Sequence, residues 1–546
     1  MKTRTEVTPE KLRGGFYSPD PLVDRCLDRV AELTRGGKGL RLLEPSAGDG
    51  AFLRGLARGG SLRASVDAVV AIEPVASEAA KCVATLEEHR LQGRVLIDSA
   101  VAWSASCDEK FECAVGNPPY VRFQFVSDDD KLSIPRLERR AGVPFTGVSN
   151  LWLPVLVGSL SRLTIGGAFA FIIPTECFTG VSAGALRTWL VRNTQQLRFD
   201  LFPPGSFPGV LQEVTILSGQ RRAITESGAE CEIQEHAVDG THSATTHFIR
   251  PNPEPWTRYL LTKPQVEAFE EASHLADVWA MNSMAKFEVA AVTGANDFFS
   301  VDAATVEQFD LSRWTTPLLP RIRHATGLRY TEGDQAQTEA AGAKAFLLDF
   351  SAERPDPSVH DRAAIYLAAG VLDELPARYK CRIREPWYRV PFIRAGKLMM
   401  SKRSHHYPRV ILNDAGVVTT DTIYRGTMIG FFEGREADLA AGFHNSLTLL
   451  SAEIEGRSFG GGVLELVPSE VGRLVVPMPD GFGTEIDRLD EVSRAATNEQ
   501  AEDVLIQETD LLLTKADVGL TADLLEPLAG ARASLLRRRL DRNASS

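Results

Sequence analysis

The first half of the chain predicts an α/β fold, a Rossmann-like sheet of seven strands with helices on both faces. Short runs rich in Val, Ile, Leu and Phe alternate with longer amphipathic stretches from Leu40 to about Arg221, which is typical of a parallel sheet with crossover helices. An acidic residue also stands at the end of each of the first three runs. Ligands of such sheets bind outside the carboxyl ends of the strands. The predicted strands are Leu40–Pro45, Ala68–Pro74, Arg94–Asp98, Phe111–Gly116, Gly167–Pro174, Leu197–Phe202 and Glu213–Gly219.

The first strand leads into a tight turn that contains two glycines and two acids. Residues without a Cβ allow the backbone to approach a ligand closely. Dinucleotide-binding turns present bare N–H groups to a pyrophosphate, which carboxylates would repel. Glu44 and Asp49 favour a cationic ligand instead, and S-adenosylmethionine carries both an ammonium and a sulfonium group. We therefore predict an S-adenosylmethionine pocket formed by Glu44, Ser46, Ala47, Gly48, Asp49 and Gly50.

The second and third predicted strands also end in acids. Glu73 lies near the distance from the glycines at which an acid meets ribose hydroxyls in such folds. Asp98 is placed to accept a hydrogen bond from an adenine amine. Either acid alone would be explained as a helix cap or a solvated strand end. Three acids at three successive strand ends favour a ligand that contains adenosine, so the predicted cofactor site also includes Glu73, Pro74, Asp98 and Ser99, and with them Asn117 after the fourth strand.

The most specific signal follows the fourth strand and reads Asn117-Pro118-Pro119-Tyr120. An adenine amine is a poor nucleophile because its lone pair is delocalised into the ring. The Asn117 side-chain oxygen and the Pro118 carbonyl can hold both amine hydrogens, which favours a pyramidal nitrogen and direct in-line methyl transfer. The two prolines stiffen the turn and remove N–H donors that would compete. The other interpretation is a Pro-Pro turn that closes a strand, with Asn117 as a cap of the next helix.

Tyr120 and Phe207 are the candidate rings for holding a target base. A base inside a duplex cannot reach the Asn117 turn, so its nucleotide must be flipped out. Stacking on Tyr120 would contribute on the order of 1–3 kcal/mol. Phe207 precedes the last predicted strand and offers a second ring at the rim of the sheet. Packing of Phe207 into the core is an equally good interpretation.

The second half of the chain has a different pattern. A strand-rich stretch near 228–249 and the proline-rich segment Pro251 to Trp256 place a domain boundary near 245. We therefore expect a catalytic domain over 1–245 and a second, α+β domain over 246–546. The second domain contains many short β-like runs and glycine clusters, and Thr521 to Arg542 predicts a basic terminal helix.

The charge distribution singles out one basic stretch. The net charge of −12 argues against a protein that coats nucleic acid without specificity, because phosphate binding depends on Lys and Arg. From Arg378 to Arg409, however, ten Lys or Arg residues face a single acid, Glu385, and five aromatic residues lie among them. The stretch is either a solvated basic face or a contact surface for nucleic acid.

Cysteine usage and hydropathy exclude several other classes. The seven cysteines form no CxxC pair and no His cluster accompanies them, so neither a disulfide framework nor a metal site is predicted. Methyl transfer should then proceed in the presence of a chelator. The apolar runs are far shorter than the roughly 18 residues that span a bilayer. We expect a cytoplasmic protein without a membrane contact.

The order of these motifs resembles the gamma class of N6-adenine DNA methyltransferases of restriction-modification systems, the class of the TaqI and Eco57I methylases. In that class a cofactor motif precedes the glycine turn, and Gly15-Phe16-Tyr17-Ser18-Pro19 matches it, with Ser18 in place of the usual threonine. Asn150-Leu151-Trp152 and the Phe207 segment follow in the expected order, so the resemblance covers about residues 1–225. It implies that Tyr17, Ser18 and Pro19 bind the cofactor and that Phe207 stacks on the target base.

Three later segments, which begin at Val292, Glu385 and Arg457, are similar to parts of the target-recognition domains of this family. The resemblance implies double-stranded DNA as the partner. The residues expected to contact DNA are Arg382, Arg384, Trp387, Tyr388, Arg389, Lys402, Arg403 and Arg457. The sequence shows no convincing PD-x(n)-(D/E)-x-K nuclease arrangement, so we expect any cognate restriction endonuclease to be encoded separately.

Several alternatives stay open. N4-cytosine methylation of DNA is chemically close, although serine more often opens the catalytic turn in those enzymes. RNA methylation uses the same chemistry. Glutamine methyltransferases of release factors share the Asn-Pro-Pro-Tyr turn, but the roughly 300 residues after the predicted catalytic domain argue against them. A DNA-binding protein with an inactive methyltransferase fold is disfavoured by the intact Asn117 turn.

Overall fold

The computed structural model describes residues 18–145, 150–180, 183–203, 214–391, 393–459, 461–496 and 499–541, apart from the side chains of Phe459 and residues 499–502. The chain forms two compact units, unit 1 up to Lys263 and unit 2 from Pro264. The division comes later than the predicted boundary at 245, because that position lies inside the last strand of the unit 1 sheet.

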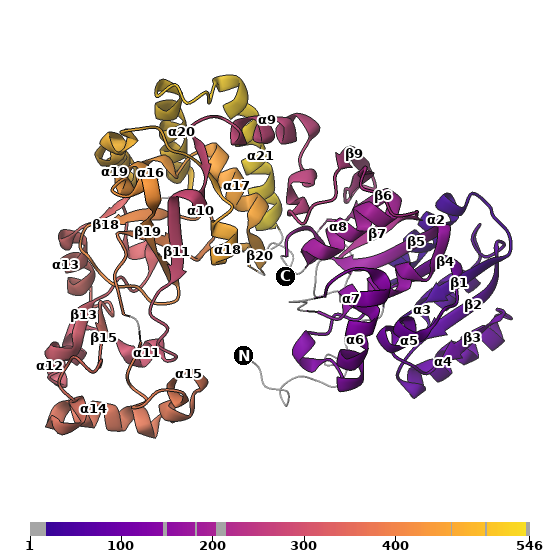
Figure 1. Ribbon diagram of the computed structural model, residues 1–546, viewed down its shortest axis with the longest axis horizontal. Coiled ribbons are helices and arrows are strands. Elements are labelled where there is room, and N and C mark those ends of the chain that lie inside the picture. The colour runs from indigo at the N-terminus through magenta and orange to yellow at the C-terminus, as the bar shows by residue number, and fades with distance from the viewer. Residues whose placement is uncertain are drawn as a thin grey trace. The chain divides into compact units, whose positions relative to one another are not determined.

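Unit 1 is built on a sheet that has nine strands among the described residues, in the order β3-β2-β1-β4-β5-β7-β6-β8-β9 (Figure 1). All seven predicted strands form. The strand-rich stretch near 228–249 supplies β8 and β9, which extend the sheet beyond β6. Every pair of neighbouring strands among β1 to β5 is parallel. Strand β7 is antiparallel to both of its neighbours, β5 and β6. The strands are β1 (Leu40–Glu44), β2 (Val66–Ile72), β3 (Gly93–Leu96), β4 (Phe111–Gly116), β5 (Leu163–Pro174), β6 (Thr194–Leu201), β7 (Val214–Arg221), β8 (Ala229–His236) and β9 (His242–Ile249).

Helices cover both faces of this sheet because the side chains of its central strands alternate between two apolar clusters. In β5, Ala168 and Ala170 belong to the cluster that α2, α3 and α4 cover. Phe169 and Phe171 belong to the opposite cluster, which α5, α6, α7 and α8 cover. The helices are α2 (Asp20–Thr34), α3 (Ala51–Ala57), α4 (Ala76–Glu88), α5 (Ala100–Ser106), α6 (Asp128–Ala141), α7 (Trp152–Ser161) and α8 (Gly184–Asn193).

One edge of the sheet collects the predicted site. Strand β1 lies between β2 and β4, and Leu43 pairs in register with Val70 on one side and Ala114 on the other. The residues that follow these strands therefore emerge next to one another. The strand order reverses between β1 and β4, and ligands of open α/β sheets bind at such a switch point.

Unit 2 contains one five-stranded sheet and three smaller sheets within its described part. The large sheet has the order β11-β19-β16-β18-β14 and is antiparallel apart from the β14–β18 pair. The mixed helices and short strands agree with the predicted α+β class. The strands are β10 (Val278–Ala280), β11 (Ala285–Val289), β12 (Ser300–Val301), β13 (Thr315–Pro317), β14 (Arg329–Tyr330), β15 (Phe346–Leu348), β16 (Leu398–Ser401), β17 (Arg403–Ser404), β18 (Val410–Asn413), β19 (Ile423–Met428), β20 (Arg457–Phe459), β21 (Val463–Glu465) and β22 (Val475–Pro477).

Helix α17 of unit 2 is buried along its whole length and packs against α18, α20 and α21. Asn445 starts α17 by accepting a hydrogen bond from the Thr448 backbone N at 2.9 Å. The predicted terminal helix is α21, and its Arg539 forms a buried ion pair with Glu453 of α17 at 2.6 Å. None of the described helices has both the length and the hydropathy to cross a lipid bilayer. The helices are α9 (Lys263–Ser273), α10 (Met281–Met284), α11 (Asn296–Phe299), α12 (Ala303–Gln308), α13 (Glu332–Ala340), α14 (Asp361–Leu372), α15 (Tyr379–Arg382), α16 (Glu436–Gly442), α17 (Ser446–Glu455), α18 (Pro468–Val471), α19 (Ile486–Ala495), α20 (Glu499–Lys515) and α21 (Ala522–Asp541).

Candidate active site

The turn after β1 forms one wall of the candidate cofactor pocket. Gly48 and Gly50 have φ angles of +53° and +86°, the left-handed region that glycine adopts without strain. A Cβ on Gly48 would meet nothing within 4 Å, so the turn borders open space at this point. Glu73 fixes the turn from β2, because its carboxylate accepts hydrogen bonds from the backbone N of Gly48 and of Val75, both at 2.9 Å. The glycine turn is therefore held from behind and open in front.

Glu44, the last residue of β1, is fully buried. Neither of its carboxylate oxygens has a hydrogen-bond partner among the described residues. Burial, together with repulsion from Asp49 and Glu73, raises the pKa of Glu44 well above its ordinary value. A buried carboxyl without a partner destabilises a fold unless a ligand satisfies it. A cationic group beside Glu44 would satisfy it and would also restore its ionised form.

The other two acids of the pocket already have protein partners. Asp49 pairs with Arg54 of α3 at 2.7 Å, and Glu73 binds the backbone of the glycine turn. All three acids act on Cys82, whose pKa is raised to about 12 by burial and then by these negative neighbours. No three His, Cys, Asp or Glu side chains in the described part of the chain are grouped to hold a metal ion. Glu44 is thus the acid with the largest unmet bonding capacity, in surroundings that favour a positive ligand.

Asn117 follows β4 and lies beside the glycine turn, because β4 pairs with β1. Its backbone carbonyl accepts a hydrogen bond from the Ser46 hydroxyl at 3.1 Å. Its side-chain Nδ2 donates to the Ser18 hydroxyl at 3.1 Å. Its Oδ1 is buried and receives no hydrogen bond from the described residues. The amide is therefore oriented through its nitrogen, while its oxygen is left as an acceptor.

The rest of the turn is held against the core. Pro118 is buried, and Pro119 and Tyr120 are half-buried. The Tyr120 ring packs against the core cluster of unit 1, and its hydroxyl donates to the Ile172 carbonyl of β5 at 3.2 Å. Burial raises the pKa of Tyr120, so the hydroxyl stays protonated as a donor. Core packing and the hydroxyl bond thus hold the Tyr120 ring in place, three residues after Asn117.

The end of β3 contributes less to this arrangement than Glu44 and Glu73 do. Asp98 is exposed and accepts a hydrogen bond from the Ser99 backbone N at 2.7 Å. The Ser99 hydroxyl caps α5 by accepting from Val101 N at 3.2 Å, and it also bonds to Asp130. Hydrogen bonds join Glu73 and Asn117 to the glycine turn, but within the described ranges none joins Asp98 or Pro74 to it.

The remaining predicted residues of this site are only partly described. Tyr17 and Phe207 lie outside the described residues. Ser18 and Pro19 are half-buried, and Pro19 stands directly before α2. The sequence assigned Ser18 to the cofactor and gave no sign of its contact with Asn117. The match of Gly15–Pro19 to a motif of the site was the one local signal that placed Ser18 near it.

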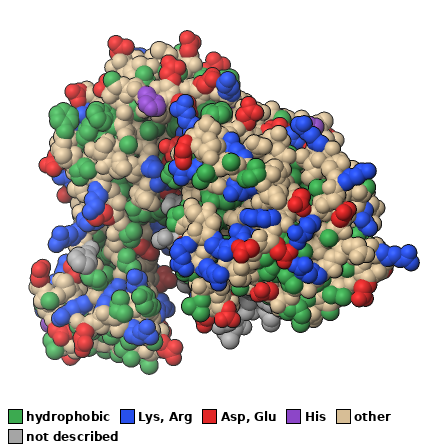
Figure 2. Space-filling model, turned by 45° about the vertical axis from the view of Figure 1, so that its right-hand side comes forward, with side chains coloured by type: hydrophobic (Ala, Val, Ile, Leu, Met, Phe, Trp, Pro, Cys, Tyr) green, Lys and Arg blue, Asp and Glu red, His purple; other side chains and the backbone are tan. Residues whose placement is uncertain are grey.

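The basic stretch of unit 2 divides into two parts. In Figure 2, Lys and Arg side chains spread over the lower left of the molecule, the part of unit 2 that carries α14 and α15 in Figure 1. Between 378 and 394, Arg378, Lys380, Arg382 and Arg394 are exposed and pair with no carboxylate among the described residues. Between 397 and 409 the basic side chains are engaged. Lys397 pairs with Glu436 at 3.3 Å, Lys402 and Arg403 pair with Glu465 at 3.6 and 2.8 Å, and Arg409 donates to the carbonyls of Ala325 and Gly327.

Several of the expected DNA contacts lie beneath this surface. The Arg384 guanidinium donates to the carbonyls of Thr293 at 2.7 Å and Val292 at 2.6 Å. Trp387 packs beside Phe298 with ring centroids 5.5 Å apart. Tyr388 is buried, and its hydroxyl donates to Asp356 at 3.1 Å. Arg389 is half-buried, and Arg457 pairs with the buried Glu470 at 2.6 Å. The contacts of Arg384, Trp387 and Tyr388 support the surface from below, whereas Arg382 is exposed on it.

Comparison with known sequences gives matches in both units. The sequence profile of the family described as "Eco57I restriction-modification methylase" matches residues 77–204, and that of "Type II methyltransferase M.Eco57I, C-terminal domain" matches residues 253–513. Type II methyltransferase M.AccI of Acinetobacter calcoaceticus is 22% identical over 385 residues, which are 67% of this chain and 68% of that protein. Type II methyltransferase M.XamI of Xanthomonas campestris pv. amaranthicola is 22% identical over 480 residues, 85% of each chain.

Solved structures resemble the chain more distantly. The type IIG restriction endonuclease BpuSI gives a TM-score of 0.40 at 13% identity, over 96% of this chain and 66% of that one. A DrdV–DNA complex gives a TM-score of 0.45 at 11% identity, over 88% of this chain and 57% of that one. The chain therefore spans somewhat less than two thirds of each of these two structures.

Proposed function

We propose, from the premise that the chain belongs to the Eco57I family of type II restriction-modification methyltransferases, that it methylates the exocyclic N6 amine of adenine at a specific site in double-stranded DNA. The observation that carries the proposal is the state of Asn117. Its Nδ2 is bonded, its Oδ1 is buried without a partner among the described residues, and it lies beside the glycine turn.

The family takes its methyl group from S-adenosylmethionine, and the pocket fits this cofactor. The fit rests on Glu44, whose buried carboxylate has no partner within the described ranges and requires a positive or donating ligand. Glu44 and the open face of Gly48 would hold the amino-acid end of the cofactor, and Glu73 is assigned to its ribose. When bound, the cofactor supplies a methyl group on a cationic sulfur. The assignments of Tyr17, Ser18, Pro19, Pro74, Asp98 and Ser99 to the cofactor remain part of the proposal.

Asn117 prepares the amine for attack. Its Oδ1 accepts one amine hydrogen, and the Pro118 carbonyl accepts the other. Two acceptors on one amine favour a pyramidal nitrogen, whose lone pair is then directed at the methyl group. The rate gain is largest when neither acceptor has to reorganise during the reaction. The Ser18 bond and the Ser46 bond meet that condition, because they fix the amide and the backbone of Asn117 before substrate arrives.

The target adenine must leave the duplex to reach Asn117, since the turn lies at the edge of a buried sheet. Tyr120 offers the ring against which the flipped base stacks, and its hydroxyl bond to Ile172 keeps that ring in place. Phe207, outside the described residues, is proposed as the second ring. The exposed Arg and Lys side chains between 378 and 394 contact the phosphates. A cognate restriction endonuclease would be a separate protein.

The test is methyl transfer followed by mapping. The full chain is incubated with plasmid DNA and S-adenosylmethionine carrying a labelled methyl group, and the modified bases are mapped at single-base resolution. We expect one recurring short sequence with N6-methyladenine, and no transfer by Asn117→Ala. N4-methylcytosine at the mapped site, or transfer to RNA or protein only, would replace the adenine assignment. A failure of the wild-type protein to label any of these substrates would overturn the proposal.

A further inference from the structure

One short surface segment of unit 2 combines exposed large apolar side chains with exposed basic ones. The α15 tip, residues 378–383, consists of α15 and one residue on each side of it. Tyr379 and Ile383 are 65% and 63% exposed. Arg378, Lys380 and Arg382 are exposed between and beside them. Two apolar side chains therefore stand among three cations within six residues.

The cations of the α15 tip are not neutralised by the described part of the protein. No carboxylate among the described residues pairs with any of the three, and Lys380 lies instead over the ring of Tyr379, 5.5 Å from its centroid. The nearest acids along the chain, Glu374 and Glu385, flank the tip on its two sides. In a chain with a net charge of −12, this local excess of positive charge indicates a negatively charged partner.

The α15 tip is also firmly mounted. Cys381, in its middle, is fully buried, and its Sγ lies 3.9 Å from the Thr293 carbonyl. Arg384, directly after the tip, donates to the carbonyls of Thr293 and Val292. Gly294 has a φ of +80°, and a Cβ there would come within 2.7 Å of Lys380 Cβ. The loop 292–294 therefore lies directly against the tip and holds it from behind, so its exposed side chains are presented by a rigid support.

We propose that the α15 tip is pressed into the groove of the DNA duplex, where Arg378, Lys380 and Arg382 bind phosphates and Tyr379 and Ile383 wedge against a base step. The inference rests on the proposed function, since it takes duplex DNA as the partner. Apolar side chains flanked by cations open base steps in this way, and the unstacking is offset by the contacts that the distorted duplex makes. A weakened base step near the target lowers the work of extruding the target nucleotide.

The chain offers a matched control for the wedge. Ile365 in α14 is 62% exposed, almost the same as Ile383, and lies outside the α15 tip. For the cations, Arg403 is the control, because it is exposed but paired with Glu465. The variants are Ile383→Ala, Tyr379→Ala and Arg382→Ala, compared with Ile365→Ala and Arg403→Ala. All five changes are at exposed side chains, and thermal unfolding checks that each variant remains folded.

The experiment uses a duplex that carries the methylation site mapped with the wild-type protein. Single adenines other than the target are replaced in turn by 2-aminopurine, whose fluorescence rises when it is unstacked. We expect wild type and Ile365→Ala to raise the fluorescence at one step outside the target. Ile383→Ala and Tyr379→Ala should lose that signal and bind roughly fivefold or more weakly. Arg382→Ala should reduce the slope of log K against log salt by about 0.9, and Arg403→Ala by much less.

The outcomes separate this inference from the function on which it rests. If wild type methylates a mapped site but Ile383→Ala and Tyr379→Ala unstack the duplex as well as Ile365→Ala does, the wedge is wrong and the methyltransferase assignment stands. The same holds if the two variants bind more weakly but keep the full 2-aminopurine signal. If wild type methylates no DNA at all, the proposed function is wrong and the wedge is wrong with it.

Discussion

Glu44 of unit 1 and Asp334 of unit 2 are both buried carboxylates in sites rich in polar groups, yet their surroundings differ completely. Glu44 has no hydrogen-bond partner among the described residues, and burial with its acidic neighbours raises its pKa. Asp334 is surrounded by donors. Burial raises its pKa, but the bonds from Arg494 and Thr331 outweigh that effect and lower the pKa to about 2.

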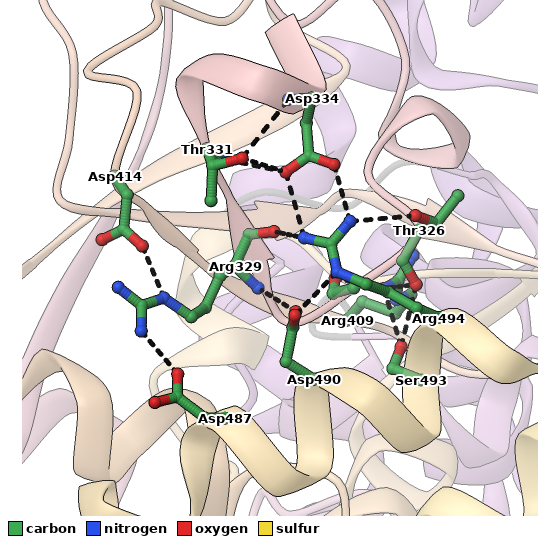
Figure 3. Close-up of polar contacts among 11 residues, drawn as sticks. Thr326, Arg329, Thr331, Asp334, Arg409, Asp414, Asp487, Asp490, Ser493 and Arg494 are labelled. Atoms are coloured by element: carbon green, nitrogen blue, oxygen red, sulfur yellow. Dashed lines mark hydrogen bonds and ion pairs between the residues drawn. The ribbon is translucent and has the colours of Figure 1, made fainter. Parts of the chain in front are cut away.

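The surroundings of Asp334 form a closed network (Figure 3). Thr331 donates to Asp334 from its backbone N at 2.8 Å and from its hydroxyl at 2.7 Å, which caps the start of α13. Arg494 of α19 binds both Asp334 oxygens at 2.6 and 3.0 Å, and also Asp490 at 2.7 Å. Asp490 in turn accepts from the Arg329 backbone N at 2.9 Å. The network ties α19 to α13 and β14.

The difference shows how to separate a structural polar cluster from a functional one. A network whose donors and acceptors are all used within the protein stabilises the fold and has nothing left for a ligand. A buried acceptor without a donor destabilises the apo protein and is retained where something else supplies the donor. By this criterion Glu44 and Asn117 Oδ1 belong to the site, and Asp334 belongs to the scaffold.

The largest expected effect is at Asn117. We expect Asn117→Ala to lower the methyl-transfer rate by roughly 10²–10³-fold or more, because a pre-oriented acceptor at the reacting amine is lost. Cofactor affinity should change little. Ser18→Ala removes the bond that orients the amide but leaves the Asn117 oxygen in place, so its rate at saturating cofactor should lie between those of wild type and Asn117→Ala. Single-turnover kinetics and calorimetric cofactor binding measure the two quantities. Near-normal turnover of Asn117→Ala would remove the unpartnered oxygen from the mechanism.

The next largest effect is at Glu44. Glu44→Gln should weaken S-adenosylmethionine binding roughly tenfold or more, because a charge-assisted contact is lost. The control is Glu78→Gln, since Glu78 pairs with Lys81 on α4 at 2.9 Å. Equilibrium dialysis with labelled cofactor compares them. Equal affinities for the two variants would mean that Glu44 is not a cofactor ligand.

The same substitution tests the pKa of Glu44 in the absence of cofactor. A folded-state pKa raised above the ordinary 4.5 means that the apo protein loses stability as the pH rises from about that value through the raised pKa. Glu44→Gln cannot ionise, so its free energy of unfolding should lack this decline and should exceed that of wild type at neutral pH. Urea unfolding at pH 5 and pH 8 measures the two free energies of unfolding, and the decline between these pH values should be larger for wild type than for Glu44→Gln. A parallel decline in the variant would contradict it.

The sequence predicted the parts of unit 1 that depend on local patterns. The strand runs, the tight turn at Gly48 and Gly50, and the Pro-Pro turn after Asn117 each follow from a few neighbouring residues. It also indicated that the ends of β1, β2 and β4 meet, because parallel strands share an edge. It could not show that Asn117 Nδ2 bonds to Ser18, 99 residues away. Nor could it show that Glu44 has no partner in the described part of the chain, since that depends on every segment packed around it.

In the basic stretch, too, the sequence could not show which side chains have partners. A count of charges cannot tell the exposed Arg382 from Arg384, whose guanidinium is used by the carbonyls of Val292 and Thr293. Nor does it show that Arg403 and Lys402 share Glu465, more than sixty residues along the chain. The pairs with Glu465 depend on the pairing of β17 with β21, and strand runs of two to six residues carry too little pattern to fix partners.

In the scaffold, we expect Asp334→Asn to lower the free energy of unfolding by about 2 kcal/mol at neutral pH, a figure reduced for the partial exposure of Arg494. Because the folded-state pKa of Asp334 is lowered to about 2, its contribution to the free energy of unfolding is fully present above pH 3.8 and is lost as the pH falls toward 2. The control is Asp480→Asn, since Asp480 is 90% exposed beside Arg435. Urea unfolding at pH 7 and pH 3 measures both. A loss no larger than that of Asp480→Asn would place Asp334 outside the stabilising core.

The smallest effect is expected at the rim of the same network, where Arg329 bonds Asp414 at 2.7 Å and Asp487 at 2.6 Å. The Arg329 side chain is 34% exposed and that of Asp487 is 77% exposed, so water and salt screen these pairs. Arg329→Met should therefore lower the free energy of unfolding by only about 0.5 kcal/mol, and the loss should shrink further in 1 M salt. The loss in Asp334→Asn should persist in salt, because the contacts that it removes are buried. Equal salt sensitivity of the two variants would mean that Asp334 is solvated like a surface acid. The opposite pKa shifts of Asp334 and Glu44 would then reflect a difference in exposure and not the presence of partners.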